Sequence, residues 1–408
     1  MTDTYTGGDV GEMQVDWMLE EASRRTGGLT DLGDDADVYL EGLGRVLGSL
    51  RTESSLNELG HLIARERMLG HTVNRLGYVD DRKTDPAVAA QEIEKPVFII
   101  GMPRTGTTIL HDILAQDPAN RAPLTWEVMF PSPPPRAETF TTDPRIAVAA
   151  ATFPDREKEL PEFKAVHPMG AELSQECVVM MGESMITPLF HNQFRVPSYE
   201  DWVDTEAPFR TVYDFHKRQL QHLQAHHARD RWVLKTGAHL WGLDQLLETY
   251  PDARIVFTHR DPVKSMTSYA SLTTMVRGVT SDSVDPHEIA ADWTPRLRRV
   301  LMNGIRVREA KEYPDAIFYD VLFTDFVRDQ FSVVQSIYDA FGLPMSDEGA
   351  AAMKAFIDDN PPGKHGVHAY RPEDYGIDRE RTRTDFAEYI EHFGLPPEEK
   401  AHVDTMPG

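Results

Sequence analysis

The sequence has little of several features that would mark particular classes of protein. Its 408 residues include one cysteine, Cys177, so an internal disulfide is excluded and a reducing compartment fits. No apolar run approaches the ~18 residues of a membrane-spanning helix. The N-terminal stretch lacks the basic and apolar regions of a signal peptide. We therefore expect a cytoplasmic protein without stable membrane insertion.

Positive charge is also scarce. The chain has 42 Lys and Arg against 66 Asp and Glu, which gives a formal net charge of −24 at pH 7. Binding to nucleic acid needs a basic surface that replaces the counterions of the phosphate backbone. We therefore expect no nucleic-acid partner, and any anionic ligand must meet a local basic pocket.

The order of the predicted elements indicates an α/β fold. Residues 1–90 repeat apolar positions every three or four residues, which predicts a helical N-terminal extension. Strands are predicted at 95–100, 231–236, 253–260 and 316–323, and helices at 107–115, 240–250, 261–272 and 326–344. This alternation indicates three layers, with a mostly parallel central sheet and flanking helices. We expect the extension to pack on one domain, residues 91–408.

A glycine loop follows the first predicted strand. In "VFIIGMPRTGTT", Gly101 and Gly106 bracket four residues as in a nucleoside-triphosphate loop, but Thr107 stands in place of its lysine. A loop between a strand and a helix aims free N–H groups at one point, which suits an anion. Arg104 adds a guanidinium that can bind phosphate through two hydrogen bonds, and Thr108 adds a hydroxyl. The alternative is an ordinary turn with a solvent-facing arginine.

A second candidate anion site follows the strand at 253–260. Arg260 ends that strand at the edge where open parallel sheets bind ligands. Asp261 is a predicted N-cap, and Ser268 lies about two helical turns further on, so both side chains can reach one phosphate. The alternative is that Arg260 pairs with a carboxylate such as Asp261. Two anion sites at neighbouring strand ends predict a ligand with two separated phosphates.

These motifs carry a family resemblance. "PRTGTT" resembles the 5′-phosphosulfate loop of sulfotransferases that use 3′-phosphoadenosine 5′-phosphosulfate (PAPS), and "THRDPVKSMTSYA" resembles their 3′-phosphate segment. The resemblance implies transfer of a sulfuryl group from PAPS to a hydroxyl, with PAP as the nucleotide product and no metal required. The nucleotide-binding residues that it implies are Arg104, Thr105, Gly106, Thr107, Thr108, Arg260, Ser268 and Phe323. Phe323 stands where better-known members have tyrosine, so an aromatic face remains without its hydroxyl.

A third segment, residues 360–378, is polar and contains Lys364, His365, His368 and Tyr370 close together. It resembles the basic loop that many bacterial members close over the nucleotide. A solvated loop is the first alternative. A zinc site at His365 and His368 is the second, although no carboxylate or cysteine set accompanies them at suitable spacing.

The general base has two main candidates. Glu127 follows the glycine loop by about twenty residues, as a catalytic glutamate does in the tyrosylprotein sulfotransferases. His239 follows a strand end that resembles the K-T-H of the cytosolic enzymes, with Gly237 and Ala238 inserted. Other groups are also open, with Glu176 and His167 foremost. The resemblance also implies that Lys235 contacts the sulfuryl oxygens.

The acceptor is expected to be a hydrophobic small molecule or lipid. The methionine-rich stretch "ECVVMMGESMITPLF" and the aromatic residues Trp126, Phe130 and Phe153 are typical either of an apolar pocket or of ordinary core. A strongly anionic glycan would be repelled by the net charge. A kinase or NTPase, and a PAP-binding protein without activity, are the alternative functions; a homo-oligomer is compatible with the sequence.

Overall fold

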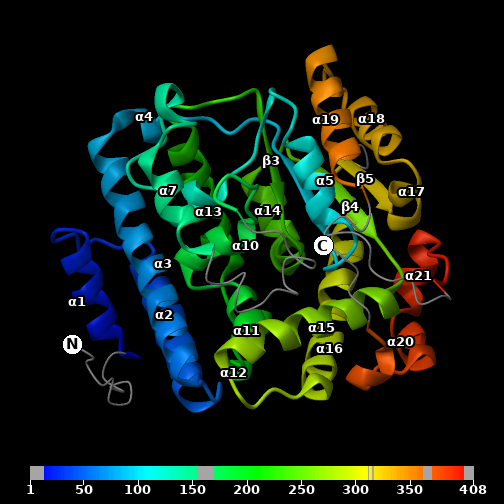
Figure 1. Cartoon of the computed structure of the whole chain (residues 1–408), viewed down its shortest axis with the longest axis horizontal. Helices are drawn as coiled ribbons and strands as arrows, with labels where there is room; N and C mark the ends of the chain where they lie inside the picture. The colour runs from blue at the N-terminus through cyan, green and yellow to red at the C-terminus, as the bar shows by residue number, and fades with distance from the viewer. Residues whose placement is uncertain (1–12, 154–169, 311, 315–316, 362–369, 399–408) are drawn as a thin grey trace.

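A five-stranded parallel sheet forms the centre of the computed structural model, which describes residues 13–153, 170–310, 312–314, 317–361 and 370–398 (Figure 1). The strand order is β2-β3-β1-β4-β5, and each neighbouring pair is parallel. The strands are β1 Val97–Gly101, β2 Asn120–Arg121, β3 Arg231–Lys235, β4 Arg254–His259 and β5 Phe318–Leu322. The four predicted strands are confirmed to within two residues at each end. β2 was missed because two residues leave no periodic pattern.

Helices cover both faces of the sheet, which confirms the three-layer α/β prediction. Residues of β1 alternate between the faces: Phe98 and Ile100 belong to the main apolar core, and Val97 and Ile99 to a second core. The second core lies against α5 Thr107–Leu114, α18 Gln330–Phe341 and α19 Asp347–Asp359. On the main-core face lie α13 Phe209–Gln224, α14 Leu243–Thr249, α15 Pro262–Thr280 and α16 Pro286–Glu309.

Shorter helices complete the chain. Those before the sheet's third strand are α6 Thr125–Met129, α7 Pro144–Ala150, α10 Cys177–Met180, α11 Leu189–Gln193 and α12 Pro197–Thr205, with the 3₁₀ turns Ala137–Thr139 and Met181–Ser184. Those after it are the 3₁₀ turn Gly237–Gly242, α17 Phe323–Arg328, the 3₁₀ turn Pro372–Tyr375, α20 Arg379–Asp385 and α21 Ala387–Phe393. Asp261 caps α15 as predicted, since its carboxylate accepts from the Val263 amide at 2.9 Å.

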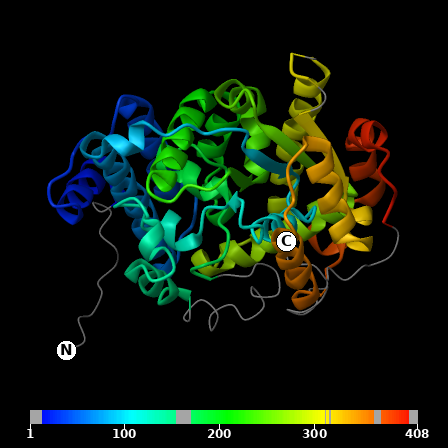
Figure 2. The ribbon, with the colours of Figure 1, turned by 90° about the horizontal axis from the view of Figure 1, so that it is seen from above.

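The N-terminal helices lie at the end of the molecule far from α17–α21 (Figures 1 and 2). They are α1 Val15–Arg25, α2 Ala36–Thr52, α3 Glu58–Thr84 and α4 Pro86–Ala89. Leu47 of α2 and Met68 of α3 are fully buried in the main core, which also contains residues of the sheet. Buried Arg75 donates to the Leu32 and Glu183 carbonyls at 2.8 and 2.9 Å. These four helices confirm the helical character predicted for residues 1–90 within the described part of the chain. The division into this extension and a domain of residues 91–408 stays a prediction.

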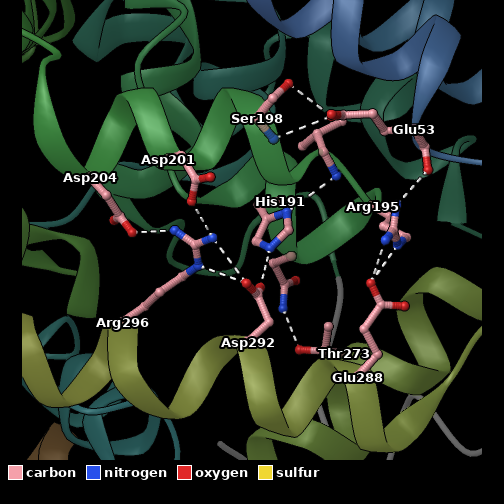
Figure 3. Close-up of polar contacts among 12 residues, drawn as sticks. Glu53, His191, Arg195, Ser198, Asp201, Asp204, Thr273, Glu288, Asp292 and Arg296 are labelled. Atoms are coloured by element: carbon pink, nitrogen blue, oxygen red, sulfur yellow. Dashed lines mark hydrogen bonds and ion pairs between the residues drawn. The ribbon is translucent and has the colours of Figure 1, made fainter.

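A polar network ties α11 and α12 to the long helix α16 (Figure 3). Arg296 of α16 donates to Asp201 at 2.7 Å and to Asp292 at 2.9 Å, and it also pairs with Asp204. His191 of α11 contacts Asp292 at 2.5 Å. Burial lowers the pKa of His191 to about 4, so its contact with Asp292 is a hydrogen bond to a neutral imidazole. Because the side chains of Arg296 and His191 are nearly buried, the ion pairs of Arg296 and this hydrogen bond hold the helices in one arrangement.

Candidate functional site

The glycine loop joins β1 to α5 in a left-handed path. Gly101 has φ +151° and Gly106, which caps α5, has φ +85°. A Cβ on Gly101 would lie 2.3 Å from Oγ1 of Thr258, so this position needs glycine. Arg104 also has a positive φ of +70°, which few residues other than glycine adopt. Backbone strain of this kind is common at functional sites. The hydrogen bonds of Arg104 to Ser268 and Arg260 keep it in this conformation.

Arg104 connects the two predicted anion sites. Its Nε donates to Oγ of Ser268 on α15 at 3.0 Å, and its carbonyl accepts from Nη1 of Arg260 at 2.9 Å. All three side chains are buried. The loop after β1 and the end of β4 therefore form one continuous cationic corner, because the two strands are neighbours in the sheet.

Phe323 lies under the second arginine. The Cζ atom of Arg260 is 3.9 Å from the centre of the Phe323 ring, a cation–π contact. A Cβ on Gly106 would lie 3.3 Å from the same ring, so Phe323 also packs against the glycine loop. The aromatic face expected here is present, and the guanidinium of Arg260 covers it.

The threonines of the loop have different surroundings. Thr105 is buried, donates to the Met102 carbonyl at 2.8 Å and contacts Oγ1 of Thr258 at 2.6 Å, so its hydroxyl braces the loop against β4. Thr107 is also buried in the first turn of α5, and Thr108 is half-buried. Oγ1 of Thr108 accepts from Nζ of Lys235 at 2.9 Å.

Lys235 and Glu176 form an ion pair beside the loop. The distance between Nζ and Oε1 is 2.5 Å, with the lysine side chain 2% exposed and the glutamate 25% exposed. Asp112 lies one turn after Thr108 and is hydrogen bonded to Ser174. Burial raises the pKa of Asp112 to about 6, and the charge of Lys235 opposes the shift. The loop thus has a cation and two carboxyl groups on its α5 side.

Glu127 lies in a buried ion pair. Its side chain is fully buried and pairs with Arg121, with an Nη1 to Oε2 distance of 2.9 Å and a second bond to Oε1. Oε2 also accepts from the Leu124 amide at 3.0 Å, closing the first turn of α6. Both oxygens are thus engaged in structural contacts, which argues against proton transfer by Glu127.

His239 packs against Phe98 and Tyr213 of the main apolar core. Its ring is fully buried, lies 5.0 Å from the ring of Phe98 and contacts the Tyr213 hydroxyl through Nδ1 at 3.1 Å. Burial lowers its pKa well below the usual value, with the neighbouring His216 adding to the effect. Gly237 and Ala238 begin a 3₁₀ turn that carries the imidazole into the main core. This position also argues against a role as base.

Several predicted residues lie outside the described part of the chain. They are Lys364, His365 and His368 of the proposed nucleotide loop, and His167 among the candidate bases. Tyr370 is described and half-buried. Their proposed roles stay predictions.

Other residues of the site were not predicted. Lys264, in the first turn of α15, is buried close enough to Arg260 and Glu398 for their charges to affect its pKa, which burial lowers. Glu398 forms an ion pair with Arg260, and Arg383 of α20 pairs with Asp261. Of these residues, only Lys264 lies close to Arg260 in the sequence, four residues after it in the first turn of α15. The other two lie more than a hundred residues away in the chain.

The methionine-rich stretch is core. Met180, Met181 and Met185 are fully buried in the main apolar cluster, and burial raises the pKa of the Cys177 thiol to about 12. Trp126, Phe130 and Phe153 gather instead in a separate cluster. Within the described residues, no helix is long and apolar enough to cross a lipid bilayer, and no group of three or more His, Cys, Asp or Glu is arranged for a metal ion.

Comparison with protein families adds independent information. The model of the sulfotransferase family matches residues 96–347, which include both anion sites. Omega-hydroxy-beta-dihydromenaquinone-9 sulfotransferase Stf3 of Mycobacterium tuberculosis (strain CDC 1551 / Oshkosh) is 25% identical over 260 residues. These residues are 61% of this chain and 63% of that protein, so the match spans less than two thirds of this curated relative.

Two solved structures are similar over nearly the whole chain. Sulfotransferase STF1 from Mycobacterium tuberculosis H37Rv is 34% identical, with a TM-score of 0.82 over 92% of this chain and 98% of the other. Sulfotransferase STF9 from Mycobacterium avium is 26% identical, with a TM-score of 0.86 over 98% of this chain and 100% of the other. The similarity therefore includes the N-terminal helices, which lie outside the family match.

Proposed function

The chain belongs to the sulfotransferase family, and on that premise we propose that it transfers a sulfuryl group from PAPS to a hydroxyl of a hydrophobic small-molecule or lipid acceptor. The observation that carries the choice of donor is the joined pair of anion sites. The Arg104 side chain donates to the Ser268 hydroxyl, and the Arg104 carbonyl accepts from Arg260. The two guanidinium groups therefore lie at one corner of the sheet. A nucleotide with phosphate groups at both its 5′ and 3′ positions fits such a corner.

The residues present suit the two ends of this donor. The 5′ end would be held by Arg104, by the hydroxyls of Thr107 and Thr108, and by the amides at the start of α5. The 3′-phosphate would be held by Arg260 and Ser268, with Lys264 adding positive charge. The hydroxyl of Thr105 braces the loop, and Gly106 would contact the donor only through its backbone amide. We also keep the proposal that the segment 360–378 closes over the nucleotide, with Lys364, His365, His368 and Tyr370 as its binding residues.

The chemistry needs stabilisation of charge on the departing 5′-phosphate. PAPS supplies the sulfuryl group, whose bond to that phosphate breaks as a bond to the acceptor oxygen forms. Arg104, Thr107 and the N-terminus of α5 would stabilise the charge that grows on this phosphate. A hydrogen-bond donor that is held in position before the reaction lowers the activation barrier by about 3 kcal/mol.

Glu176 is the proposed base. It lies beside Lys235, next to the loop, and a quarter of its side chain is exposed, so an acceptor hydroxyl can approach it. Its carboxylate would take the proton that the acceptor loses. Lys235, bonded to both Glu176 and Thr108, would bind the sulfuryl oxygens and keep the base at hydrogen-bond distance from the reacting centre.

The acceptor proposal rests on the relative and on charge. The relative's name gives a lipid alcohol, an omega-hydroxylated dihydromenaquinone, as its acceptor. The chain carries a net charge of −24, which disfavours strongly anionic acceptors. Exposed Leu173 lies three residues before Glu176 in the chain, so an apolar side chain is available close to the proposed base.

Transfer of radioactive sulfate from labelled PAPS to a panel of lipid alcohols and phenols tests the proposal. The wild-type chain should label at least one hydrophobic acceptor. Arg104→Ala should lower kcat/KM by about 10²–10³-fold, while Arg328→Ala, a matched change of an arginine that is 76% exposed, should leave it unchanged. Equal activity of Arg104→Ala and wild type would remove the loop from the reaction, and transfer of phosphate from ATP with Mg²⁺ would replace the proposal by a kinase.

A further inference from the structure

The chain supplies its own anion to the second site. After α21 ends at Phe393, residues 395–398 run back along the end of β4 and line a small cavity with Arg260, Asp261 and Phe323. Leu395 is 7% exposed and belongs to the main apolar core, which anchors the start of this segment. The segment is therefore anchored at Leu395, while Pro396 and Pro397 are exposed.

Glu398 holds the guanidinium of Arg260 through both of its oxygens. Nε of Arg260 lies 3.1 Å from Oε1, and Nη2 lies 3.2 Å from Oε2. The two side chains are 3% and 9% exposed. This forked contact uses the same pair of donors through which an arginine binds a phosphate group.

The backbone of the segment is held as well. The Glu398 amide donates to Oδ2 of Asp261 at 2.8 Å, and Arg383 of α20 pairs with the same oxygen. Asp261 therefore links three elements at this point: the start of α15, helix α20 and the C-terminal segment. The side chain and the main chain of Glu398 are both bound at the position proposed for the 3′-phosphate.

A carboxylate and a phosphate cannot share this position. Glu398 uses the edge of the guanidinium formed by Nε and Nη2, while Nη1 donates to the Arg104 carbonyl. Two anions within a few ångströms also repel each other in a buried site. Lys264 beside the pair makes the position attractive to either anion. Whichever binds must exclude the other.

We propose that Glu398 is an internal competitor, which occupies the 3′-phosphate site of the nucleotide-free protein and leaves when the nucleotide binds. This inference rests on the proposed function, since it needs a nucleotide with a 3′-phosphate. It assigns the C-terminal segment a regulatory role: the affinity for PAPS and the release of PAP are set by how firmly the segment returns to Arg260.

Calorimetric titration of Glu398→Gln with PAP and with AMP, which lacks the 3′-phosphate, tests the inference. PAP should bind the variant about tenfold more tightly than wild type, the scale of one hydrogen bond to a charged group, and AMP affinity should not change. Glu391→Gln removes the same charge from an exposed residue of α21 and should behave as wild type with both ligands.

The outcomes separate the two proposals. If PAP binds neither wild type nor Glu398→Gln, the proposed function fails and the inference fails with it. If PAP binds both with equal affinity, or binds the variant more weakly, the inference alone is overturned. Should the variant not fold, hydrogen exchange in wild type gives the answer: PAP should speed exchange of the Glu398 amide, and unchanged or slower exchange would overturn the inference.

Discussion

The cations of the candidate site are bound to groups of the protein itself. Lys235 pairs with Glu176, Arg260 with Glu398, and Arg104 with the hydroxyl of Ser268. This pairing limits the cost of burying positive charge before a ligand binds. In the proposed reaction the contact of Lys235 with Glu176 is kept, whereas Glu398 must leave Arg260 when the nucleotide binds.

The proposed base is tested by comparing Glu176→Gln with Glu127→Gln and His239→Asn at saturating PAPS. Glu176→Gln should lower kcat by about 10²–10⁴-fold because general-base catalysis contributes on that scale. Glu127→Gln should instead lower the free energy of unfolding by about 3–5 kcal/mol, since it breaks a buried ion pair with Arg121. When kcat is calculated per folded molecule, Glu127→Gln and His239→Asn should both have the wild-type value.

A loss of kcat in Glu127→Gln or His239→Asn at unchanged stability would contradict this assignment. Full activity of Glu176→Gln would do the same. Circular dichroism and urea unfolding of each variant separate the effect on chemistry from the effect on folding.

At the scale of elements, the glycine loop depends on close backbone approach between β1 and its neighbours. A Cβ on Gly101 would meet the side chain and the carbonyl of Thr258 on β4, and a Cβ on Gly237 would lie 2.6 Å from the Gly101 carbonyl. The strands on either side of β1 thus fix where the loop begins. The positions of Arg104 and of the start of α5 follow from that.

Gly101→Ala should therefore destabilise the fold by about 2–4 kcal/mol, through overpacking and an unfavourable positive φ. Gly70→Ala is the matched control, because Gly70 lies inside α3 with nothing within 4 Å of an added Cβ. It should stabilise the protein by about 0.5–1 kcal/mol. Urea unfolding measures both, and equal stability of the two variants would show that the close approach at Gly101 carries no energy.

Local patterns explain which elements the sequence predicts. The apolar runs around Phe98 and Phe257 and the glycines of the loop are contiguous, so strands, loop and α5 follow from short stretches. The partners of the site do not: Glu398 lies 138 residues after Arg260, and a carboxylate near the end of the chain has no local signal. Glu127 and His239 were predicted as bases from the spacing of related sequences. Their actual environments depend on the ion pair with Arg121 and on the turn that begins at Gly237 and Ala238.

At the scale of the whole molecule, residues from the first and the last parts of the described chain share one apolar core with the sheet that carries the site. Leu47 and Met68 near the N-terminus share one apolar core with Leu395 near the C-terminus. Helix α15 contacts α3 on one side and α20 on the other, and it carries Ser268 and Lys264. The stability of the anion corner therefore depends on packing along the full described length.

Calorimetric titration of wild type and Arg260→Ala with PAP and AMP, without added metal, tests most directly whether the two anion sites hold one nucleotide. Arg260→Ala should weaken PAP binding by about 1.5–3 kcal/mol, the scale of hydrogen bonds to charged groups, and should leave AMP binding unchanged. An equal loss for both nucleotides, or no loss for PAP, would contradict the account.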